Sequence, residues 1–423
     1  MGEEREPADL RDDGVIRATL LHQLMDWEGT DLKNVYEPIS QQIGYLFCFF
    51  LFILCSYLAW KKYKRWRIES KEKLIPYKVI KPPSRLVSED EGAKKKRVCV
   101  VVGGTGFIGS QVVNELVQRD EYYVYVLGRT FRPERTNPNA DCLIQVDMRD
   151  IDGLVKAFQG VDSVINAAAF IPSVFTSADD VRRVNKTGFE NIIRAIKETG
   201  VKNLVHLSGI PIAQRIKEPV MRAFWTTITS FETTVKEANG QDGLNTCIVG
   251  PSNIVGLRSS LFKDIVSGKL TEMPMPNKMP ISFMPVEYIA RALVNAEAKL
   301  AAGDKQIAGK FFPLRGELMS WKTLFQLPTW PHKIKESSKW VLTLVVKLNV
   351  FCANVFGWAP FGPDVSAAIF EILEATESDE IDSKQITEAY DLLGVGPPAP
   401  PMEEYIAEMV KQYKASQETQ KDK

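Results

Sequence analysis

Three glycines, Gly103, Gly106 and Gly109, are the residues whose type and spacing point most directly to a chemical task. They follow an apolar, mostly β-branched run, Val98–Val102, and a helical pattern over Phe107–Gln118 overlaps them. A GxxGxxG turn between a buried strand and a helix permits a tight bend, close approach of backbone to a pyrophosphate, and close packing of helix on strand. The N–H groups at the start of that helix then bind the phosphates. We therefore predict a dinucleotide site here, against the alternative of a glycine-rich turn without ligand.

Residues after the next strands extend the predicted cofactor site. Arg129, with Arg132 close by, favours NADP(H) over NAD(H), because an arginine at the end of the second strand accommodates the 2′-phosphate; an exposed arginine there is also common, so NAD(H) stays open. Asp147, after a third strand, is expected to bind the adenine amino group or to act as a helix N-cap. The segment Asn166–Ala169 offers small side chains where backbone must approach a cofactor. The predicted cofactor-binding set comprises Gly103, Thr105, Gly106, Phe107, Ile108, Gly109, Arg129, Asp147, Met148, Ala167, Ala168 and Pro251.

Strand-like and helix-like patterns alternate from residue 98 onward, and these elements must position the site. The further predicted strands are Tyr123–Leu127, Cys142–Val146, Ser163–Asn166, Asn203–Leu207 and Asn245–Val249. The further predicted helices are Ile151–Phe158, Asp179–Glu198 and Arg222–Asn239. This alternation predicts an α/β fold, a Rossmann-like doubly wound parallel sheet with right-handed crossovers.

Composition limits the class of protein. Apolar residues make up 45% and charged residues 25% of the 423 residues, which is ordinary for a globular protein. A formal net charge of zero gives no support for a nucleic-acid partner, and three histidines leave little for a metal site. The six cysteines are scattered without a CxxC pair, so a reducing compartment is expected for the folded part.

The N-terminal part contains an uncharged run at 38–60, almost wholly apolar over 43–60. As a helix that apolar part would be about 27 Å long, close to the thickness of a bilayer core. The basic run KKYKRWR follows it, and the acidic residues 1–37 are unlike a mitochondrial presequence. These features predict a single-pass membrane protein with its globular domain on the cytoplasmic or an equivalent side. The endoplasmic reticulum is favoured, mitochondrial and plastid membranes stay open, and a buried core helix is the alternative.

The predicted domains are an acidic polar tail at 1–37, a transmembrane helix at 38–60, a basic, proline-containing tether at 61–97, a NAD(P)-binding Rossmann domain at 98–250, and a C-terminal lobe at 251–423. The methionine- and proline-rich stretch 271–285 is expected to be a surface loop, with a pliable apolar wall beside a lipid-like ligand as the alternative. The apolar stretch 340–358 is too interrupted to span a membrane. It is expected to lie on a membrane surface or to pack against the domain.

Several motifs give the chain a family resemblance. They are GGTGFIG at 103–109, VDMRD at 146–150, INAAA at 165–169, RVNKTGFENIIRAIKETGVKNLVHLSG at 183–209, ETTVKEANG at 232–240, LNTCIVGPSNIVG at 244–256 and FMPVEYIARAL at 283–293. The chain resembles the extended short-chain dehydrogenase/reductase superfamily, and within it the 3β-hydroxysteroid dehydrogenase/isomerase family and its sterol-dehydrogenase relatives. The resemblance covers roughly residues 97–330. It implies a Rossmann domain with a smaller C-terminal substrate lobe, and oxidation or reduction of sterol-type alcohols with NAD(P).

That resemblance also implies a catalytic tyrosine and lysine four residues apart on one helix, with a serine on the preceding loop. Here the tyrosine position holds Phe224, the lysine position Ile228 and the serine position Gly209, with Ser208 one residue early. The tyrosine would transfer the proton and the lysine would lower its pKa, whereas phenylalanine exchanges no proton and isoleucine carries no charge. The family's arginine before the proline of the sixth strand is replaced by Gly250. We therefore expect the usual chemistry to be absent.

Three hypotheses about function follow. The first is a membrane-anchored, NAD(P)(H)-binding pseudoenzyme that acts as a sensor, a scaffold or an accessory subunit of a membrane complex, resembling the extended-dehydrogenase subunit of respiratory complex I. The second is an active NADP(H)-dependent oxidoreductase on a sterol or other lipid alcohol or ketone, with Ser208 or water as the proton donor. The third is a lyase, an epimerase-like or a non-nucleotide role. The expected partners are a lipid bilayer, a sterol-like or lipid ligand and proteins of a membrane complex, with no nucleic acid.

Overall fold

The computed structural model of the chain describes residues 45–59, 62, 74–83, 96–173, 175–210, 219–273, 281–356, 359–360, 382–395 and 399–421. The chain divides into two compact units, Met1–Glu72 and Lys73–Lys423. In the first unit, residues 45–59 form a helix. The predicted acidic tail at 1–37 and most of the basic run after Trp60 lie outside the described residues.

The helix at 45–59 falls within the predicted transmembrane segment 38–60, of which 38–44 and 60 lie outside the described residues. Among the residues that the structure describes, no helix has both the length and the apolar character needed to cross a membrane. The expectation of a transmembrane helix, and with it a single-pass protein of the endoplasmic reticulum or another membrane, is therefore wrong.

An eight-stranded sheet forms the centre of the second unit, in the order β1-β4-β3-β2-β5-β6-β7-β11. The strands are β1 (Lys78–Lys81), β2 (Arg97–Val102), β3 (Tyr122–Gly128), β4 (Cys142–Gln145), β5 (Ser163–Asn166), β6 (Asn203–Leu207), β7 (Asn245–Pro251) and β11 (Phe311–Leu314). All neighbouring pairs are parallel except β1 and β4, which are antiparallel. The predicted Rossmann-like parallel sheet is confirmed.

The β2 strand shows why this sequence forms a central parallel strand. Val98–Val102 is buried throughout, because helices cover both faces of the sheet and an apolar side chain is stabilised on either side. All six residues of β2 are in register with β3, from Arg97 opposite Tyr122 to Val102 opposite Leu127. This pairing brings the ends of the two strands to one edge, where the glycine turn begins.

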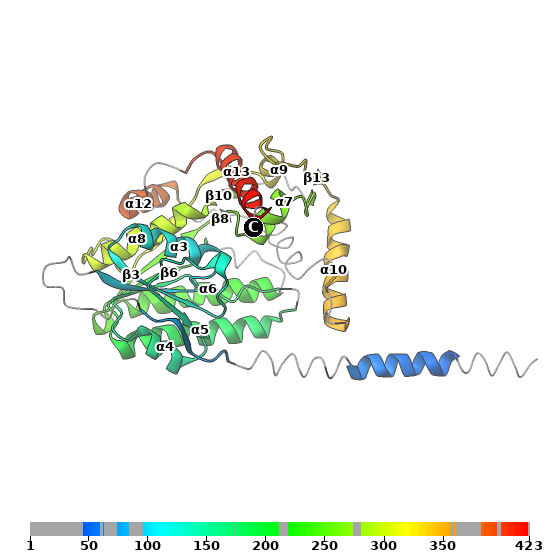
Figure 1. Cartoon of the computed structure of the whole chain (residues 1–423), viewed down its shortest axis with the longest axis horizontal. Helices are drawn as coiled ribbons and strands as arrows, with labels where there is room; N and C mark the ends of the chain where they lie inside the picture. The colour runs from blue at the N-terminus through cyan, green and yellow to red at the C-terminus, as the bar shows by residue number, and fades with distance from the viewer. Residues whose placement is uncertain are drawn as a thin grey trace, which may run out of the picture. The chain divides into compact units, whose positions relative to one another are not determined.

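Helices cover the two faces of the sheet (Figure 1). On one face lie α4 (Ile151–Phe158), α5 (Ala178–Thr199) and α6 (Pro219–Ala238), and on the other α3 (Phe107–Gln118), α8 (Val286–Ala301) and α12 (Ser383–Leu393). The two apolar cores separate in the same way, with Leu116, Leu293 and Leu393 in one and Leu154, Ile192 and Ile228 in the other. The α5 helix begins with a capping box at Ser177 and ends at Gly200, whose φ of 73° is left-handed.

The remaining elements pack around a third apolar cluster. The structure describes β8 (Asn253–Val255), β10 (Ile281–Pro285) and β12 (Glu317–Met319) as one small sheet, and β9 (Glu272–Met273) and β13 (Lys335–Glu336) as another. The helices here are α7 (Ser260–Val266), α9 (Trp321–Phe325) and α13 (Met402–Lys421). Two short 3₁₀ helices, Pro133–Arg135 and Gln241–Gly243, lie in loops. The stretch 271–285 is not simply a surface loop, because β10 is buried along its whole length; residues 274–280 lie outside the described part.

Two segments of the main unit come from outside the predicted 98–250 range. The β1 strand lies in the segment expected to be a tether, and it adds to the sheet edge through β4. The β11 strand and α8 come from the predicted C-terminal lobe, yet β11 pairs with β7 and α8 packs on the sheet.

The α10 helix (Lys339–Phe356) is the element predicted at 340–358. Val346, Asn349 and Ala353 on one side are buried, whereas the large apolar side chains of the other side are exposed. Those exposed side chains are Trp340, Val341, Leu344, Leu348 and Phe351.

Candidate dinucleotide site

The glycine turn joins the end of β2 to the start of α3. Gly103 has a φ of 79°, in the left-handed region that favours glycine. A Cβ at position 109 would lie 2.2 Å from the carbonyl oxygen of Gly103, and one at 106 would lie 3.0 Å from the same atom. Side chains at these positions would therefore fill the space next to the turn. The sequence-based reason for each glycine agrees with this geometry.

The start of α3 leaves backbone donors available at the edge of the sheet. Gly106 is the N-cap residue, it makes no side-chain cap hydrogen bond, and the first turn of α3 contains no acidic residue. The first N–H groups of a helix lack intrahelical acceptors and carry the positive end of its dipole. Gly106 is exposed, with Phe107 and Ile108 half-buried beside it. The turn thus fits an anionic pyrophosphate, and the chain's own backbone would hold it.

Two neighbouring loops pack closely on this turn. A Cβ at Gly103 would lie 2.8 Å from Cα of Ala168, so the loop after β5 lies directly against the turn. The side chain of Asn166 fixes that loop, since its Oδ1 accepts a 3.1 Å hydrogen bond from the N–H of Ala168. Thr105 packs on Gly128 at the end of β3, where a Cβ would lie 2.7 Å from its Oγ1. Close backbone packing explains the small residues at 167–169.

Asp147 has a different partner from the two that the sequence suggested. The guanidinium of Arg149 donates to both of its carboxylate oxygens, Nε to Oδ1 at 2.9 Å and Nη2 to Oδ2 at 2.8 Å. Burial raises the pKa of the Asp147 carboxyl. The hydrogen bonds and charge of Arg149 lower this pKa by more than burial raises it, so that it lies below its usual range. The N-cap of α4 is Asp150, whose side chain accepts from the N–H of Gly153. The N-cap interpretation of Asp147 is wrong, and adenine binding by Asp147 stays a prediction.

Arg129 follows β3 as expected, and its side chain lies over the carboxyl edge of the sheet. Its guanidinium carbon is 5.9 Å from the centre of the Phe170 ring, which belongs to the loop after β5. Since β2 lies between β3 and β5, Arg129 extends toward the far side of the glycine turn. Arg129 is exposed and its charge helps to lower the pKa of Asp147. A positive charge therefore lies where a dinucleotide would be bound.

Two other predicted residues lie at the margins of the site. The side chain of Met148 packs on α5, where a Cβ at Gly188 would lie 1.9 Å from its Cε. Pro251 ends β7, and its carbonyl accepts a 3.0 Å hydrogen bond from the N–H of Ile210. Cofactor contacts by Met148 and Pro251 stay predictions.

Ser208, the suggested substitute proton donor, is bonded to a buried acid. Its hydroxyl donates to Oε1 of Glu232 on α6, and its N–H donates to the carbonyl of Val249 at 2.8 Å. Burial raises the pKa of Glu232, while the Ser208 hydrogen bond and the charge of Lys236 oppose that shift. Glu232 is 7% exposed. Ser208 directly precedes Gly209 in the chain, and the sequence alone did not single out Glu232 for chemistry.

Aromatic side chains fill the space around the expected catalytic serine and tyrosine positions. A Cβ at Gly209 would lie 2.6 Å from Cζ3 of Trp225. The ring of Phe224 packs edge-on against the same indole, with 5.5 Å between ring centres. The indole nitrogen of Trp225 is buried and has no hydrogen-bond partner among the described residues. A serine side chain at 209 would need the indole to move.

Apolar side chains also surround the expected lysine position, 228, and the expected arginine position, 250. Ile228 is 4% exposed and lies in the core cluster beneath α4, α5 and α6. A Cβ at Gly250 would lie 2.3 Å from Cζ of Phe311 on β11, so Phe311 occupies the volume of a side chain at 250. The sequence missed Trp225 and Phe311 because neither stands at a motif position, and Phe311 reaches the site only through the β7–β11 pairing.

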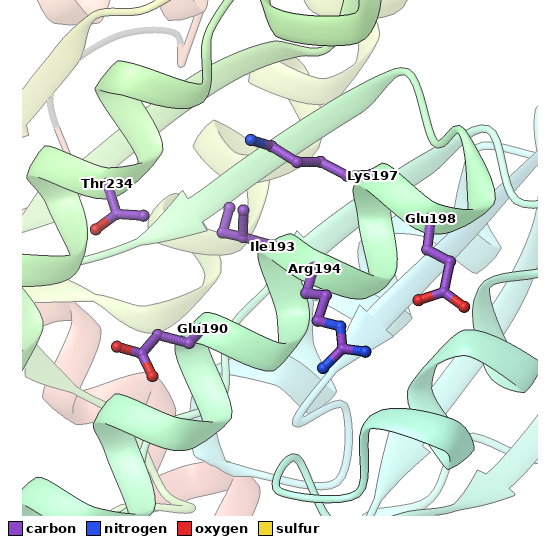
Figure 2. Close-up of a pocket in the computed structure, with 6 residues that line it drawn as sticks. All are labelled: Glu190, Ile193, Arg194, Lys197, Glu198 and Thr234. Atoms are coloured by element: carbon purple, nitrogen blue, oxygen red, sulfur yellow. The ribbon is translucent and has the colours of Figure 1, made fainter.

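A separate hollow of about 550 Å³ lies on the outer side of α5 and α6 (Figure 2). Its lining residues are Glu190, Ile193, Arg194, Lys197, Glu198 and Thr234. None of them belongs to the glycine turn, and most are exposed charged side chains of a solvated helix face. The hollow is therefore no part of the dinucleotide site. Among the described residues, no group of three or more His, Cys, Asp or Glu side chains is placed to hold a metal ion.

The parallel sheet and its glycine turn define a dinucleotide-binding fold of the extended short-chain dehydrogenase/reductase type. Residues 99–275 match the NAD dependent epimerase/dehydratase family, and the chain carries a domain of this family. The sequence-based resemblance to this superfamily is thereby confirmed.

Two curated proteins with similar sequences are named as steroid or sterol dehydrogenases. One is 3β-hydroxysteroid-dehydrogenase/decarboxylase isoform 2 of Arabidopsis thaliana, 27% identical over 346 residues, which are 72% of this chain and 60% of the relative. Another is sterol-4-alpha-carboxylate 3-dehydrogenase, decarboxylating, of Bos taurus, 26% identical over 254 residues, with 56% of this chain and 69% of the relative covered. The chain spans between 51% and 60% of the length of the first three relatives that it matches.

Solved structures support the fold. The UDP-glucose 4-epimerase of Thermotoga maritima with UDP-glucose superposes with a TM-score of 0.56 at 17% identity, over 75% of this chain and 99% of that one. At this identity the likeness extends to the fold alone. The described part of unit Lys73–Lys423 therefore has the architecture of these enzymes, whatever its own ligand.

Proposed function

We propose that this chain binds a nicotinamide dinucleotide at the carboxyl edge of its sheet and does not use it for the oxidoreductase chemistry of its relatives. One contrast carries the proposal. The glycine turn is shaped for a pyrophosphate, whereas the neighbouring space at Gly209 is filled by the indole of Trp225. A chain that has the glycine turn, and in which an aromatic ring fills the space at Gly209, is suited to hold the cofactor as a sensor or scaffold.

The residues of this chain would hold the dinucleotide in three ways. Backbone N–H groups of Phe107 and Ile108 would bind the pyrophosphate, with the α3 dipole adding to the attraction. The loop at Ala168, fixed by Asn166, would form the wall beside the turn. When bound, the nicotinamide supplies a carbon that accepts or donates hydride. Proton transfer to a substrate would need a donor, which neither Phe224 nor Ile228 provides.

We further propose a preference for NADP(H) over NAD(H). Arg129 lies over the carboxyl edge, beside Phe170, with no carboxylate bound to its guanidinium among the described residues. A phosphate at the ribose 2′ position would give this side chain a charge-assisted hydrogen bond. Replacing Arg129 by glutamine is expected to weaken the binding of NADP⁺ about tenfold and to leave the binding of NAD⁺ unchanged.

The experiment is a calorimetric titration of the purified full chain with NADP⁺ and NAD⁺, followed by a turnover assay with the reduced and oxidised cofactors and a panel of 3-hydroxy and 3-keto sterols. The proposal expects binding without turnover. Binding with sterol-dependent oxidation or reduction of the cofactor would contradict the non-catalytic part. A failure to bind either dinucleotide would contradict the proposal as a whole.

A second candidate function rests on the Ser208–Glu232 pair. A buried carboxyl whose pKa is raised by burial and which is hydrogen-bonded to a hydroxyl is a group that can take part in proton exchange. We propose an active oxidoreductase on a sterol-like or other lipid alcohol as this alternative, with Ser208 in contact with the substrate oxygen. This alternative predicts turnover in the assay above. The variant Ser208→Ala should lose that turnover and still bind the cofactor.

A further inference from the structure

The segment between β8 and α7 brings a cation next to the glycine turn. Gly256 packs on the ring of Phe107, since a Cβ at 256 would lie 2.9 Å from Cε2 of that ring. Arg258 follows two residues later and is exposed. The backbone that carries Arg258 is therefore beside the start of α3, although the residue comes from the part of the chain predicted to be the C-terminal lobe.

The side chain of Arg258 reaches the loop that follows β3. Its Nη2 donates a 3.3 Å hydrogen bond to the carbonyl oxygen of Glu134, in the 3₁₀ helix Pro133–Arg135. Arg135 is the next residue, so the Arg258 guanidinium is bonded to the 3₁₀ turn that carries Arg135. Burial lowers the pKa of Arg258, and the positive charge of Arg135 lowers it further. Two arginines from distant parts of the chain are thus held close together.

No acid neutralises this pair within the described part of the chain. Neither Arg135 nor Arg258 forms an ion pair there, in contrast to Arg149, which is paired with Asp147 at 2.8 Å, and Arg119, which is paired with Glu115 at 2.7 Å. Solvated single arginines are common on protein surfaces. Here the Arg258 side chain is bonded to the carbonyl oxygen of the residue before Arg135, neither arginine has a carboxylate partner, and both lie beside a phosphate-type turn, which is a geometry suited to an anion.

We infer that Arg135 and Arg258 form a clamp for a phosphate monoester at the mouth of the dinucleotide site. The planar guanidinium groups would each donate to phosphate oxygens, and the clamp would tie the β8–α7 segment to the loop after β3 when the anion binds. The chemistry is that of a phosphate monoester dianion, supplied either by the 2′-phosphate of NADP(H) or by a separate phosphate ligand. The first source rests on the proposed function, and the second does not.

The test compares the full-length chain with Arg258→Gln and Arg135→Gln. Arg194→Gln is the matched control, because Arg194 is an exposed arginine on α5 without an ion pair in the described part and lies in the separate hollow of Figure 2. Each protein is titrated with NADP⁺, NAD⁺, 2′,5′-ADP and inorganic phosphate in phosphate-free buffer of low ionic strength. Thermal unfolding checks that the variants fold, and Arg258→Lys shows whether charge alone is sufficient.

Either clamp variant should bind NADP⁺ and 2′,5′-ADP about 10- to 100-fold more weakly than the wild type. If NAD⁺ binding and the Arg194→Gln control are unchanged, this result would establish the cofactor as the source of the phosphate. Loss of inorganic phosphate binding alone would establish a separate phosphate ligand. Unchanged binding of all four probes, or equal weakening of NADP⁺ and NAD⁺, would overturn the clamp. If the wild-type chain binds neither dinucleotide, the proposed function fails, and the inorganic phosphate titration alone then decides the clamp.

Discussion

The indole of Trp225 lies directly against Gly209, so that a Cβ at position 209 would be 2.6 Å from Cζ3 of the indole ring. This contact separates the chain from the catalytic pattern that its motifs resemble. A serine at 209 and the present position of the indole are incompatible, because real Cβ contacts are not that short. The relationship lies in the loop after β6 and on α6, the two elements that would carry the proton-transfer groups.

The first prediction concerns this contact. Gly209→Ser is expected to lower the free energy of unfolding by about 1–3 kcal/mol, because the new side chain must displace a packed aromatic ring. Trp225→Ala should remove the penalty, so that the double variant is no less stable than Trp225→Ala alone. Denaturant unfolding of the four proteins measures the coupling. Additive effects would show that the two residues are independent.

The second prediction concerns rebuilding the tyrosine–lysine pair. Phe224 is half-buried and Phe224→Tyr should be tolerated, whereas Ile228 is 4% exposed and packs in an apolar core. Ile228→Lys places an ammonium there, so the variant should lose several kcal/mol and its lysine pKa should fall well below the usual value. Ile228→Met is the matched control. Equal stability of the Lys and Met variants at neutral pH would contradict the buried placement of position 228.

A third prediction follows from His206, which is fully buried on β6 and packs edge-on against the stacked rings of Phe189 and Phe231. Burial lowers its pKa from 6.5 to about 3, only partly offset by the hydrogen bond with Asn166. The unfolded chain therefore takes up a proton before the folded one as pH falls. Stability should drop by roughly 1.4 kcal/mol per pH unit from about pH 6.5 down toward pH 3.

Urea unfolding as a function of pH measures this effect. The variant His206→Leu should flatten the acid slope, although the amide of Asn166 loses its acceptor and the protein becomes less stable near pH 7. The control His332→Gln removes an exposed histidine and should leave the slope in place. An unchanged slope in His206→Leu would assign the acid sensitivity to other groups.

The fourth prediction concerns a polar cluster at the amino ends of the strands. Glu297 on α8 is fully buried and accepts hydrogen bonds from the hydroxyls of Tyr122 at 2.6 Å and Ser163 at 2.7 Å, with Arg97 paired to it at 3.3 Å. Tyr122→Phe should cost about 1–3 kcal/mol, because a buried carboxylate loses a donor. Tyr123→Phe, on the neighbouring half-buried position, is the control. Equal stability of the two variants would contradict the burial of this network.

The sequence was sufficient to predict the alternating strands and helices of the central sheet, and insufficient to predict the strands added at its two edges. Strands such as Val98–Val102 are apolar along their length, and α4 and β5 have the bounds that the pattern predicts. The β1 and β11 strands were missed because each is short and joins the sheet only through a partner distant in sequence.

The candidate site shows the same division between local and long-range information. The glycine turn could be predicted, because each glycine answers a local backbone requirement. The pairing of Asp147 with Arg149, the bond from Ser208 to Glu232 and the filling of Gly209 by Trp225 depend on side-chain geometry that spacing does not specify. The expectation of a membrane span at 38–60 rested on apolar character and run length alone, whereas no helix among the described residues has both the length and the apolar character to cross a membrane.

The most direct test of the account is the binding stoichiometry of NADP(H) and NAD(H) on the purified full chain, measured by calorimetry together with mass spectrometry of small molecules released from it. Gly109→Ala is the matched variant, since its Cβ would lie 2.2 Å from the Gly103 carbonyl oxygen, and Gly160→Ala controls for a left-handed glycine with open space around it. The account predicts one dinucleotide per wild-type chain, loss of binding in Gly109→Ala and retention in Gly160→Ala. A folded wild-type chain that contains no dinucleotide and binds neither form would contradict it.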